Sequence, residues 1–225
     1  MTSKADLTWI DDNAPFSKRF KDRYFSAQNG REETRAVFMA GNGLPERWHT
    51  GGHFHIAELG FGTGLNFFET LDQWNRTAWE TGRLSFTSFE RYPLSLDEIH
   101  RALANWPELL QLASPLLDQW PCRKLQIGTV ELQLIFGDAR LSLPQWPEKA
   151  DAWYLDGFSP AKNPQLWDLD LLRDVFGHTK KNGTFSTYTA AGFVRRNLQE
   201  AGFEVQRVPG FGNKRERLQG RKSLA

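Results

Sequence analysis

The segment HIAELGFGTGLNFFETL, residues 55–71, constrains the fold more than any other part of the sequence. An apolar run ends in Glu58, glycines follow at three alternate positions, and apolar residues then recur at the spacing of a helix. The first amide groups of a helix have no partner inside the helix, and glycines let polar atoms of a ligand approach the backbone. The segment therefore predicts a strand, a ligand-binding turn and a helix, the opening unit of a doubly wound α/β sheet.

Strand and helix patterns alternate over the rest of the chain. Apolar runs predict strands at residues 54–59, 83–90, 150–158, 183–189, 203–212 and 215–220, and two more around Gly128 within residues 124–138. Helical spacing predicts helices within residues 66–76, 95–106, 106–120, 166–180 and 190–202. The last two strands have no helix between them. We therefore expect an α/β fold with a seven-stranded, mostly parallel sheet and an antiparallel C-terminal hairpin at one edge.

The first 53 residues carry turn signals such as QNGREE and GNGLPERW, which predict a small, hairpin-rich extension packed on a core domain of residues 54–225. No apolar run approaches the roughly 20 residues needed to span a bilayer, and the N-terminus lacks the apolar centre of a secretory signal. Cys122 is the single cysteine, which excludes an internal disulfide and a cysteine metal cage. We expect a cytoplasmic, monomeric protein without a membrane partner.

The spacing of the glycines separates two classes of cofactor. A dinucleotide site requires G-x-G-x-x-G, but the position of its third glycine is Leu65. The glycines stand instead at Gly60, Gly62 and Gly64. Preceded by Glu58, they resemble the S-adenosylmethionine loop of Rossmann-like class I methyltransferases. An acid at this position can neutralise the ammonium group of the methionine part, directly or through water.

Two further acids end later strands. Glu90 closes the predicted strand at residues 83–90, where a carboxylate can accept both hydroxyls of a ribose. Asp138 follows the next long strand, where it can accept the adenine amino group while the Ala139 amide completes the contact. The alternative is that these acids only cap helices. Three acids at three strand ends favour a nucleoside site.

The segment DAWYLDGFSPAKNPQLW carries the residues expected to face the methyl acceptor. Its strand delivers Asp156 to the edge of the sheet, where a carboxylate can orient an amine and take up its proton. Phe158 or Trp167 can offer an aromatic wall to a base, although helix packing explains Trp167 equally well. Lys162 and Asn163 of the same loop complete the expected substrate-binding residues.

Several motifs together resemble one family. The strings FGTGLNF, DAWYLDGFSPAKNPQLW, AGFVRRNLQEAGF and GFGNKRERLQG, preceded by YFSAQNGREETRAVF, are similar to the methyltransferase half of the bacterial tRNA 5-methylaminomethyl-2-thiouridine biosynthesis proteins. The resemblance implies methyl transfer from S-adenosylmethionine to the aminomethyl nitrogen of a modified wobble uridine in tRNA. It implies that the cofactor is held by Glu58, Gly60, Gly62, Gly64, Glu90 and Asp138. Asp156 would then face the amine.

Segments at both ends extend the expected substrate site. Under the resemblance, Tyr24, Asn29 and Glu33 close over the cofactor or the base, although the same segment is also typical of an ordinary hairpin. Basic residues gather near the C-terminus, and we expect Lys214 and Arg215 to contact RNA. The full basic group is Arg207, Lys214, Arg215, Arg217, Arg221 and Lys222. A solvated basic face is the alternative.

Metal is not expected in this chain. Three histidines near the first strand of the core lack a carboxylate partner at ligand spacing. They are His49, His53 and His55.

Many members of the resembled family continue into an FAD-dependent oxidase domain that generates the amine. This chain stops at Ala225 without a second glycine fingerprint, so we expect a stand-alone methyltransferase or an excised domain that holds no FAD. A separate oxidase or tRNA-modifying complex would supply the aminomethyl substrate. Two other interpretations stay open: a small-molecule amine methyltransferase or aminopropyltransferase on the same fold, and a non-catalytic RNA-binding module.

Overall fold

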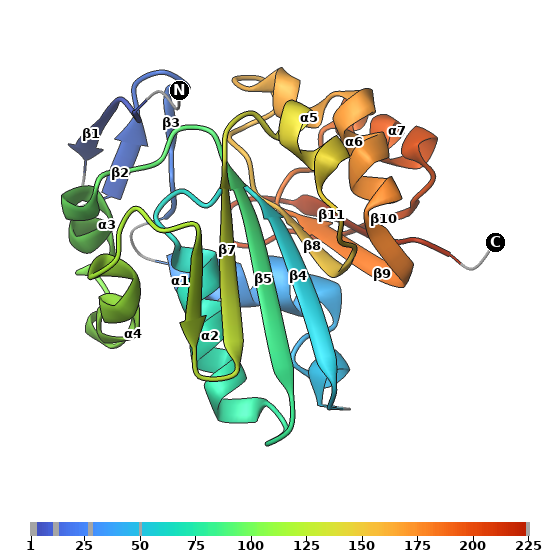
Figure 1. Cartoon of the computed structure of the whole chain (residues 1–225). Helices are drawn as coiled ribbons and strands as arrows, with labels where there is room; N and C mark the ends of the chain where they lie inside the picture. Colours follow the sequence, from blue (N-terminus) through green and yellow to red (C-terminus); the bar gives the residue numbers. More distant parts are fainter. Residues whose placement is uncertain (1–3, 11–13, 27–28, 50, 224–225) are drawn as a thin grey trace.

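The computed structural model describes residues 4–10, 14–26, 29–49 and 51–223 (Figure 1). Within these residues the main sheet has eight strands in the order β10-β11-β9-β8-β4-β5-β7-β6. Their bounds, in the same order, are Glu204–Pro209, Glu216–Arg221, Thr179–Thr187, Ala150–Leu155, His53–Leu59, Arg83–Glu90, Val130–Phe136 and Lys124–Ile127. The central strands from β9 to β7 are parallel. The pairs β10–β11, β11–β9 and β6–β7 are antiparallel.

This arrangement confirms the α/β class and the C-terminal hairpin, and it corrects the strand count. The sheet has one strand more than the predicted seven, since the two segments around Gly128, both predicted as strands, each join it. Gly128 takes a φ of +57°, which is available to glycine at little cost, and the chain reverses there so that β6 pairs back along β7.

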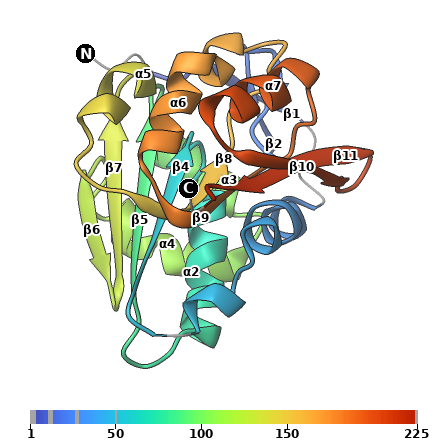
Figure 2. The ribbon, with the colours of Figure 1, turned by 90° about the vertical axis from the view of Figure 1, so that its right-hand side faces the viewer.

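Helices cover both faces of the sheet (Figures 1 and 2). One face carries α2 (Leu65–Thr77), α3 (Leu96–Leu103) and α4 (Pro107–Leu117), and the other carries α5 (Ala139–Ser142), α6 (Leu169–Gly177) and α7 (Gly192–Ala201). Neighbouring residues of a strand point to opposite faces, so Tyr154 of β8 lies in the first core and Trp153 in the second. Both are fully buried, which explains why β8 is apolar at consecutive positions. None of the helices in the described part of the chain is long and apolar enough to cross a membrane.

The N-terminal extension combines a small sheet with a helical segment. Strands β1 (Leu7–Ile10), β2 (Ala14–Ser17) and β3 (Asp22–Arg23) form the antiparallel sheet. Four helical turns follow: α1 (Gly30–Glu33), the π-helical turn η1 (Thr34–Met39), η2 (Ala40–Asn42) and η3 (Glu46–Trp48). The hairpin prediction is therefore right for the first part and wrong after residue 29. Ala27 and Gln28 of the predicted turn lie outside the described residues, and the division at residue 53 stays a prediction.

Buried ion pairs explain why this segment is helical. Arg31, only 8% exposed, donates to Glu69 at 2.6 Å and to Asp72 at 3.2 Å on α2, and it also contacts Glu108 on α4. Arg35, one helical turn later, pairs with Glu69 as well. Tertiary ion pairs of this kind outweigh the local preference of Asn29-Gly30 for a turn. They fix α1 against α2 and place its next residues at the site described below.

Candidate active site

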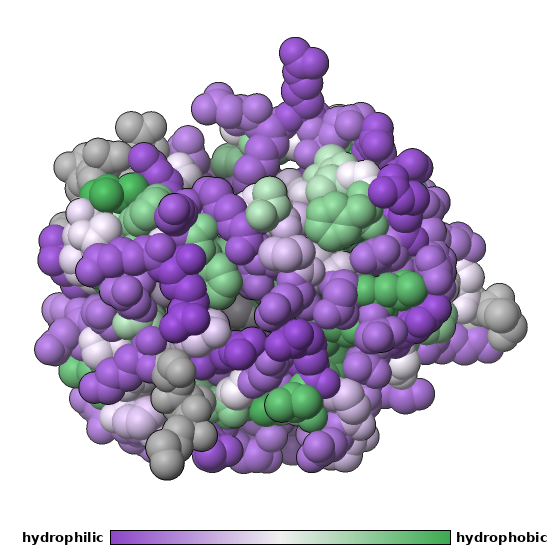
Figure 3. Space-filling view, turned by 90° about the horizontal axis from the view of Figure 1, so that it is seen from above, coloured by the Kyte–Doolittle hydropathy of each residue, from purple (hydrophilic) through white to green (hydrophobic). Residues whose placement is uncertain are grey.

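The described residues enclose a cavity of about 1060 Å³ at the carboxyl ends of the parallel strands, the usual ligand position in such sheets. Its walls come from β3, α1, the glycine loop after β4, the ends of β5 and β7, the segment after β8, and the tip between β10 and β11. Figure 3 views this side of the molecule, where hydrophilic side chains dominate and apolar groups form separate small patches. The cavity thus joins the core domain to the extension.

The glycine loop is fixed by a close backbone approach. Gly60 has a φ of +95°, and a Cβ there would lie 2.5 Å from the backbone oxygen of Asp156. Gly64 precedes the first turn of α2 with a φ of +78°, and a Cβ would lie 2.9 Å from the Phe61 and Phe68 rings. Both positions therefore exclude other residues for steric reasons. The Gly62 amide donates to Glu90 Oε2 at 2.9 Å, which ties the loop to β5.

Glu90 and Asp138 both line the cavity, as the sequence predicts. Glu90 is buried, and this burial raises the pKa of its carboxyl group above the usual value. Asp138 accepts from Arg91 at 2.8 Å and from Arg140 at 2.6 Å, and it caps α5 through the Arg140 amide. The bonds from Arg140 hold the pKa of Asp138 below its usual range. Asp138 is thus both a helix cap and a wall residue, with Ala139 beside it.

Glu58 is placed differently from the other acids. It is completely buried and lies behind the cavity rather than in its wall. Its carboxylate accepts from Asn66 Nδ2 at 2.9 Å and from Ser88 Oγ at 2.7 Å. Burial raises its pKa to about 8, and nearby Asp156 and Glu90 add to the rise. Glu58 therefore does not line the cavity itself and is linked to it by its hydrogen bond from Asn66.

Asp156 follows β8 and is half-buried in the cavity wall. Its Oδ2 accepts from Asn66 Nδ2 at 2.7 Å, so one amide group donates to both Asp156 and Glu58. Thr34 Oγ1 lies 2.7 Å from Asn66 Oδ1 and fixes the amide from its other side. Burial raises the pKa of Asp156 to about 7 and nearby Glu33 adds to this rise, whereas the bond from Asn66 opposes it. A carboxylate with this pKa can accept a proton near neutrality.

Aromatic rings gather over the loop that follows Asp156. Phe158 stacks on Phe20 with ring centres 4.7 Å apart, and the Tyr24 ring meets Phe158 edge-on at 5.0 Å. All three line the cavity. Trp167 does not: it is 1% exposed and its indole nitrogen donates to Phe158 O at 3.0 Å. The packing interpretation of Trp167 is right, and its interpretation as an aromatic wall is wrong.

Asp22 of β3 holds the same loop from outside. It accepts from the Ser159 amide at 2.9 Å and from Lys162 Nζ at 3.0 Å. Lys162 and Asn163 both line the cavity, but the Lys162 ammonium is engaged by the extension. Asn29, at the opposite wall, is exposed. These contacts join two segments that lie more than a hundred residues apart in the sequence.

Most members of the C-terminal basic group are paired with other residues of the fold, some of them at the surface. Arg217 donates to Ser186 Oγ at 2.9 Å, and Lys222 to the Phe176 and Thr179 carbonyls. Two other members form ion pairs, Arg207 with Glu216 and Arg221 with Glu204. Lys214 reaches the cavity, whereas exposed Arg215 is not placed in its wall. The expected contact of Lys214 and Arg215 with RNA stays a prediction.

Other segments also bring cations to the cavity. Arg19 and Arg91 lie over the Tyr92 ring at 4.6 and 5.3 Å, and Arg140 stands beside them at Asp138. All line the cavity.

No group of three His, Cys, Asp or Glu side chains that could hold a metal ion occurs among the described residues.

Comparison with known proteins decides the family. A profile described as S-adenosyl-L-methionine-dependent methyltransferase matches residues 107–223, more than half of the chain. The chain belongs to this family. S-adenosylmethionine is accordingly the methyl donor, and the predicted class I methyltransferase fold is confirmed.

Two relatives of the methyltransferase are named tRNA 5-methylaminomethyl-2-thiouridine biosynthesis bifunctional protein MnmC. The Aeromonas hydrophila protein is 46% identical over 235 residues, covering 97% of this chain and 35% of its own length. The Caulobacter vibrioides protein is 47% identical over 225 residues, covering 97% and 38%. The chain thus spans little more than a third of the length of these relatives, whose names bear out the resemblance seen in the sequence.

Solved structures agree with this placement. MNMC2 from Aquifex aeolicus superposes with a TM-score of 0.77 at 25% identity, covering 97% of this chain and 70% of that one. Spermidine synthase from Thermotoga maritima shares the fold, with a TM-score of 0.54 at 10% identity and coverage of 96% and 71%.

The cavity of this methyltransferase fits the donor. Gly60 and Gly62 have no side chain, so the backbone of their loop is open to the cavity. A Cβ at Gly62 would lie 3.2 Å from the Tyr24 ring. The Glu90 and Asp138 carboxylates offer acceptors for hydroxyl and amino groups. Sequence reasoning missed Asn66 and Thr34, and also Tyr188, which lines the cavity. In the sequence, Asn66 stands out only as the polar residue in the otherwise apolar first turn of the predicted helix.

Proposed function

We propose that this chain transfers a methyl group from S-adenosylmethionine to the aminomethyl nitrogen of 5-aminomethyl-(2-thio)uridine at the wobble position of tRNA. The product is 5-methylaminomethyl-(2-thio)uridine. The observation that carries the proposal is the position of Asp156: a carboxylate with a pKa of about 7 that stands directly beside the glycine loop. The names of the relatives support the choice of acceptor.

The methyl donor supplies an electrophilic methyl group on a sulfonium. We assign its binding to the residues of the glycine loop and the next two strand ends: Gly60, Gly62, Gly64, Glu90, Asp138 and Ala139. Glu58 supports this side through Asn66. Proximity and orientation are expected to account for much of the rate enhancement, because a bound amine need only be held in line with the methyl group.

Asp156 prepares the amine. A primary alkylamine is mostly protonated near neutrality and has no lone pair for attack. The Asp156 carboxylate accepts one N–H proton, and the neutral nitrogen can then bond to the methyl carbon as the carbon–sulfur bond breaks. Phe158, Tyr24 and Phe20 provide apolar faces for the uracil ring.

The cations around the cavity support an RNA acceptor over a small amine. Arg19, Arg91 and Arg140 all stand at its wall, where backbone phosphates can meet them. The aminomethyl group itself would come from another active site, such as a separate FAD-dependent oxidase or a tRNA-modifying complex.

Methyl transfer from labelled S-adenosylmethionine to tRNA tests the proposal. The tRNA comes from a strain lacking this activity, and the product is digested and its nucleosides identified. We expect label only in 5-methylaminomethyl-uridines, with an apparent affinity for tRNA that falls steeply as salt rises. Label that enters spermidine-type amines but not tRNA would favour the small-molecule alternative. A chain that binds no S-adenosylmethionine would favour a non-catalytic RNA-binding module.

A further inference from the structure

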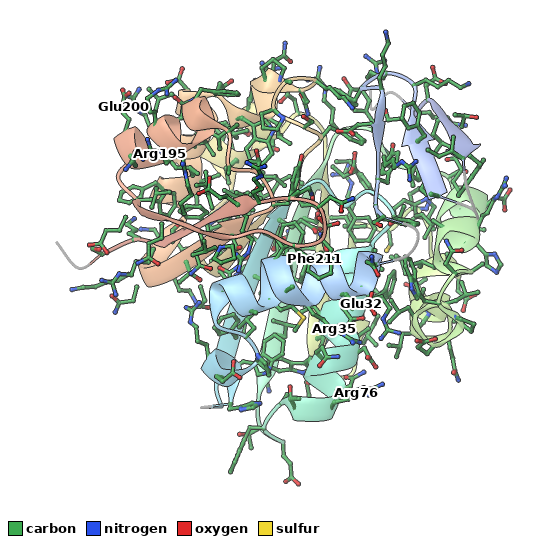
Figure 4. All side chains as sticks on the ribbon, turned by 180° about the vertical axis from the view of Figure 1, so that it is seen from behind. Glu32, Arg35, Arg76, Arg195, Glu200 and Phe211 are labelled. Carbon is green, nitrogen blue, oxygen red and sulfur yellow. The ribbon has the colours of Figure 1, made fainter. Side chains whose placement is uncertain are left out.

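The ammonium group of Lys214 occupies a defined place in the acceptor side of the cavity. Lys214 Nζ lies 2.8 Å from Glu33 Oε1 and 4.0 Å from the centre of the Tyr188 ring. A carboxylate and an aromatic face are two groups that stabilise an alkylammonium ion well. In Figure 4 the hairpin tip that carries Lys214, marked by Phe211, lies over the helical segment that begins with α1.

Asp156 stands within electrostatic reach of both members of this ion pair. Glu33 raises the pKa of Asp156 and Lys214 lowers it. Tyr188 is fixed in the same wall because its hydroxyl donates to Gly157 O at 2.7 Å, one residue beyond Asp156. The carboxylate that we assign to the amine therefore lines the same cavity as a place that already holds an ammonium group.

We infer that Glu33 and the face of Tyr188 form the subsite that receives the alkylammonium group of the substrate, and that Lys214 fills this subsite in the free protein. The inference rests on the proposed function, because it takes the acceptor to be a primary amine. A protonated aminomethyl group has the same chemistry as the end of a lysine side chain. The two therefore compete for the same partners.

The two members of the Lys214–Glu33 ion pair are held very differently. The Lys214 side chain is 43% exposed at a hairpin tip and can leave without disturbing the core. The Glu33 side chain is only 21% exposed and stands on α1, which the buried pairs of Arg31 fix to α2. The subsite is thus rigid on its carboxylate side and exchangeable on its cation side.

When the substrate ammonium replaces Lys214, Glu33 and Asp156 have different roles. Glu33 holds the substrate ammonium, while Asp156 takes one of its protons. The freed lone pair forms the nitrogen–carbon bond, and the electron pair of the breaking carbon–sulfur bond stays on sulfur. A secondary ammonium and a thioether result, and the proton on Asp156 passes to water. Glu33 is therefore a specificity-determining residue for a cationic acceptor.

The test measures how strongly the protein prefers an RNA that carries the amine. Two anticodon stem-loops of one sequence, with 5-aminomethyluridine or uridine at the wobble position, are titrated into the full chain with S-adenosylhomocysteine present. A charge-assisted contact predicts a preference of about tenfold for the amine in the wild type. Glu33→Gln should remove most of this preference, and Lys214→Met should increase it because the competing cation is gone. Glu32→Gln, on the exposed side of the same helical turn, should leave it unchanged.

The outcomes separate this inference from the proposed function. A Glu33→Gln protein that keeps the wild-type preference, or a Lys214→Met protein that loses it, would overturn the subsite while tRNA methylation still stands. Lys214 is exposed, so its substitution tests the inference even if the Glu33 variant fails to fold. Absence of methyl transfer to tRNA by the wild type would instead refute the proposed function.

Discussion

The two sides of the cavity are built in different ways. The donor side comes from three adjacent parallel strands, β4, β5 and β7, and each contributes the residues that directly follow it. The acceptor side combines the extension, the segment after β8, Tyr188 and the tip of the β10–β11 hairpin. The donor side is thus a local property of strand ends, whereas the acceptor side exists only after distant segments pack together. Substitutions on the two sides should accordingly fail in different ways.

The largest effect is expected for Asp156→Ala on the acceptor side. Loss of the proton acceptor should lower kcat by about 10³-fold, in the range typical of a general base. The affinity for S-adenosylmethionine, measured by calorimetry, should stay within about twofold of the wild type because the donor side is intact. Near-normal turnover by this variant would show that Asp156 is not the base.

Arg31→Ala tests whether the ion pairs of Arg31 to α2 anchor the extension, which forms part of the acceptor side. The substitution leaves buried Glu69 and Asp72 without their common cation, and we expect a loss of about 4 kcal/mol in the free energy of unfolding. Chemical denaturation measures this change. Arg76→Ala is the matched control: it removes an exposed partner of the same Asp72 and should cost less than about 1 kcal/mol. Equal effects of both variants would contradict the anchoring role.

Gly60→Ala tests the contact between the two sides. The new methyl group would lie 2.5 Å from Asp156 O at a backbone φ of +95°, so the loop or the end of β8 must shift. We expect a loss of about 3 kcal/mol in unfolding free energy, from strain and steric overlap together. Gly128 also has a positive φ, of +57°, but no atom lies within 4 Å of the Cβ that Gly128→Ala adds. It should cost about 1 kcal/mol, and a smaller difference between the variants would argue against the overlap.

Glu90→Ala should weaken donor binding more than it lowers kcat, which is the opposite of the pattern expected for Asp156→Ala. The substitution removes the carboxylate assigned to the ribose hydroxyls and also the acceptor of the Gly62 amide. We expect the Kd for S-adenosylmethionine to rise by about tenfold or more, with a smaller change in kcat at saturating donor. An unchanged calorimetric affinity would refute the ribose assignment.

The smallest effect is a shift in pH dependence caused by Asn66→Ala. In the proposed mechanism Asp156 is the base, so kcat/KM should rise with pH through about 7, where its carboxyl group loses its proton. The hydrogen bond from Asn66 favours the ionised form and lowers this pKa. Its removal should move the rising limb to higher pH, whereas Gln73→Ala on the same helix should leave it in place. An unmoved limb would mean that Asn66 does not tune Asp156.

The free energy of unfolding should also depend on the ionisation of Asp156. The pKa of Asp156 is raised in the folded protein, so the unfolded chain loses this proton first as pH rises. Between the ordinary aspartate pKa and about 7, ionisation therefore favours unfolding. Asp156→Asn should flatten this part of the unfolding free energy profile.

Sequence alone determined the donor side and most of the sheet. The order of apolar runs and turns predicted the strands, because a strand buried on both faces must be apolar along its length. The glycine spacing, Glu90 and Asp138 were found because each stands beside a strand end in the sequence itself. The position of Asp156 followed from the same rule.

Only the tertiary structure decided the rest. Asn29-Gly30 is typical of a turn, yet buried ion pairs to α2 and α4 make the next residues helical. The basic C-terminus suggested an RNA contact, but Arg217 and Lys222 donate to groups inside the fold, and Lys214 pairs with a residue 181 positions away. Charge and hydrogen-bonding capacity are visible in a sequence, but the choice of partner depends on which segments meet in space. The position of the glycine loop could therefore be predicted from its own residues, while the pairing of Glu33 with Lys214 beside Tyr188 could not.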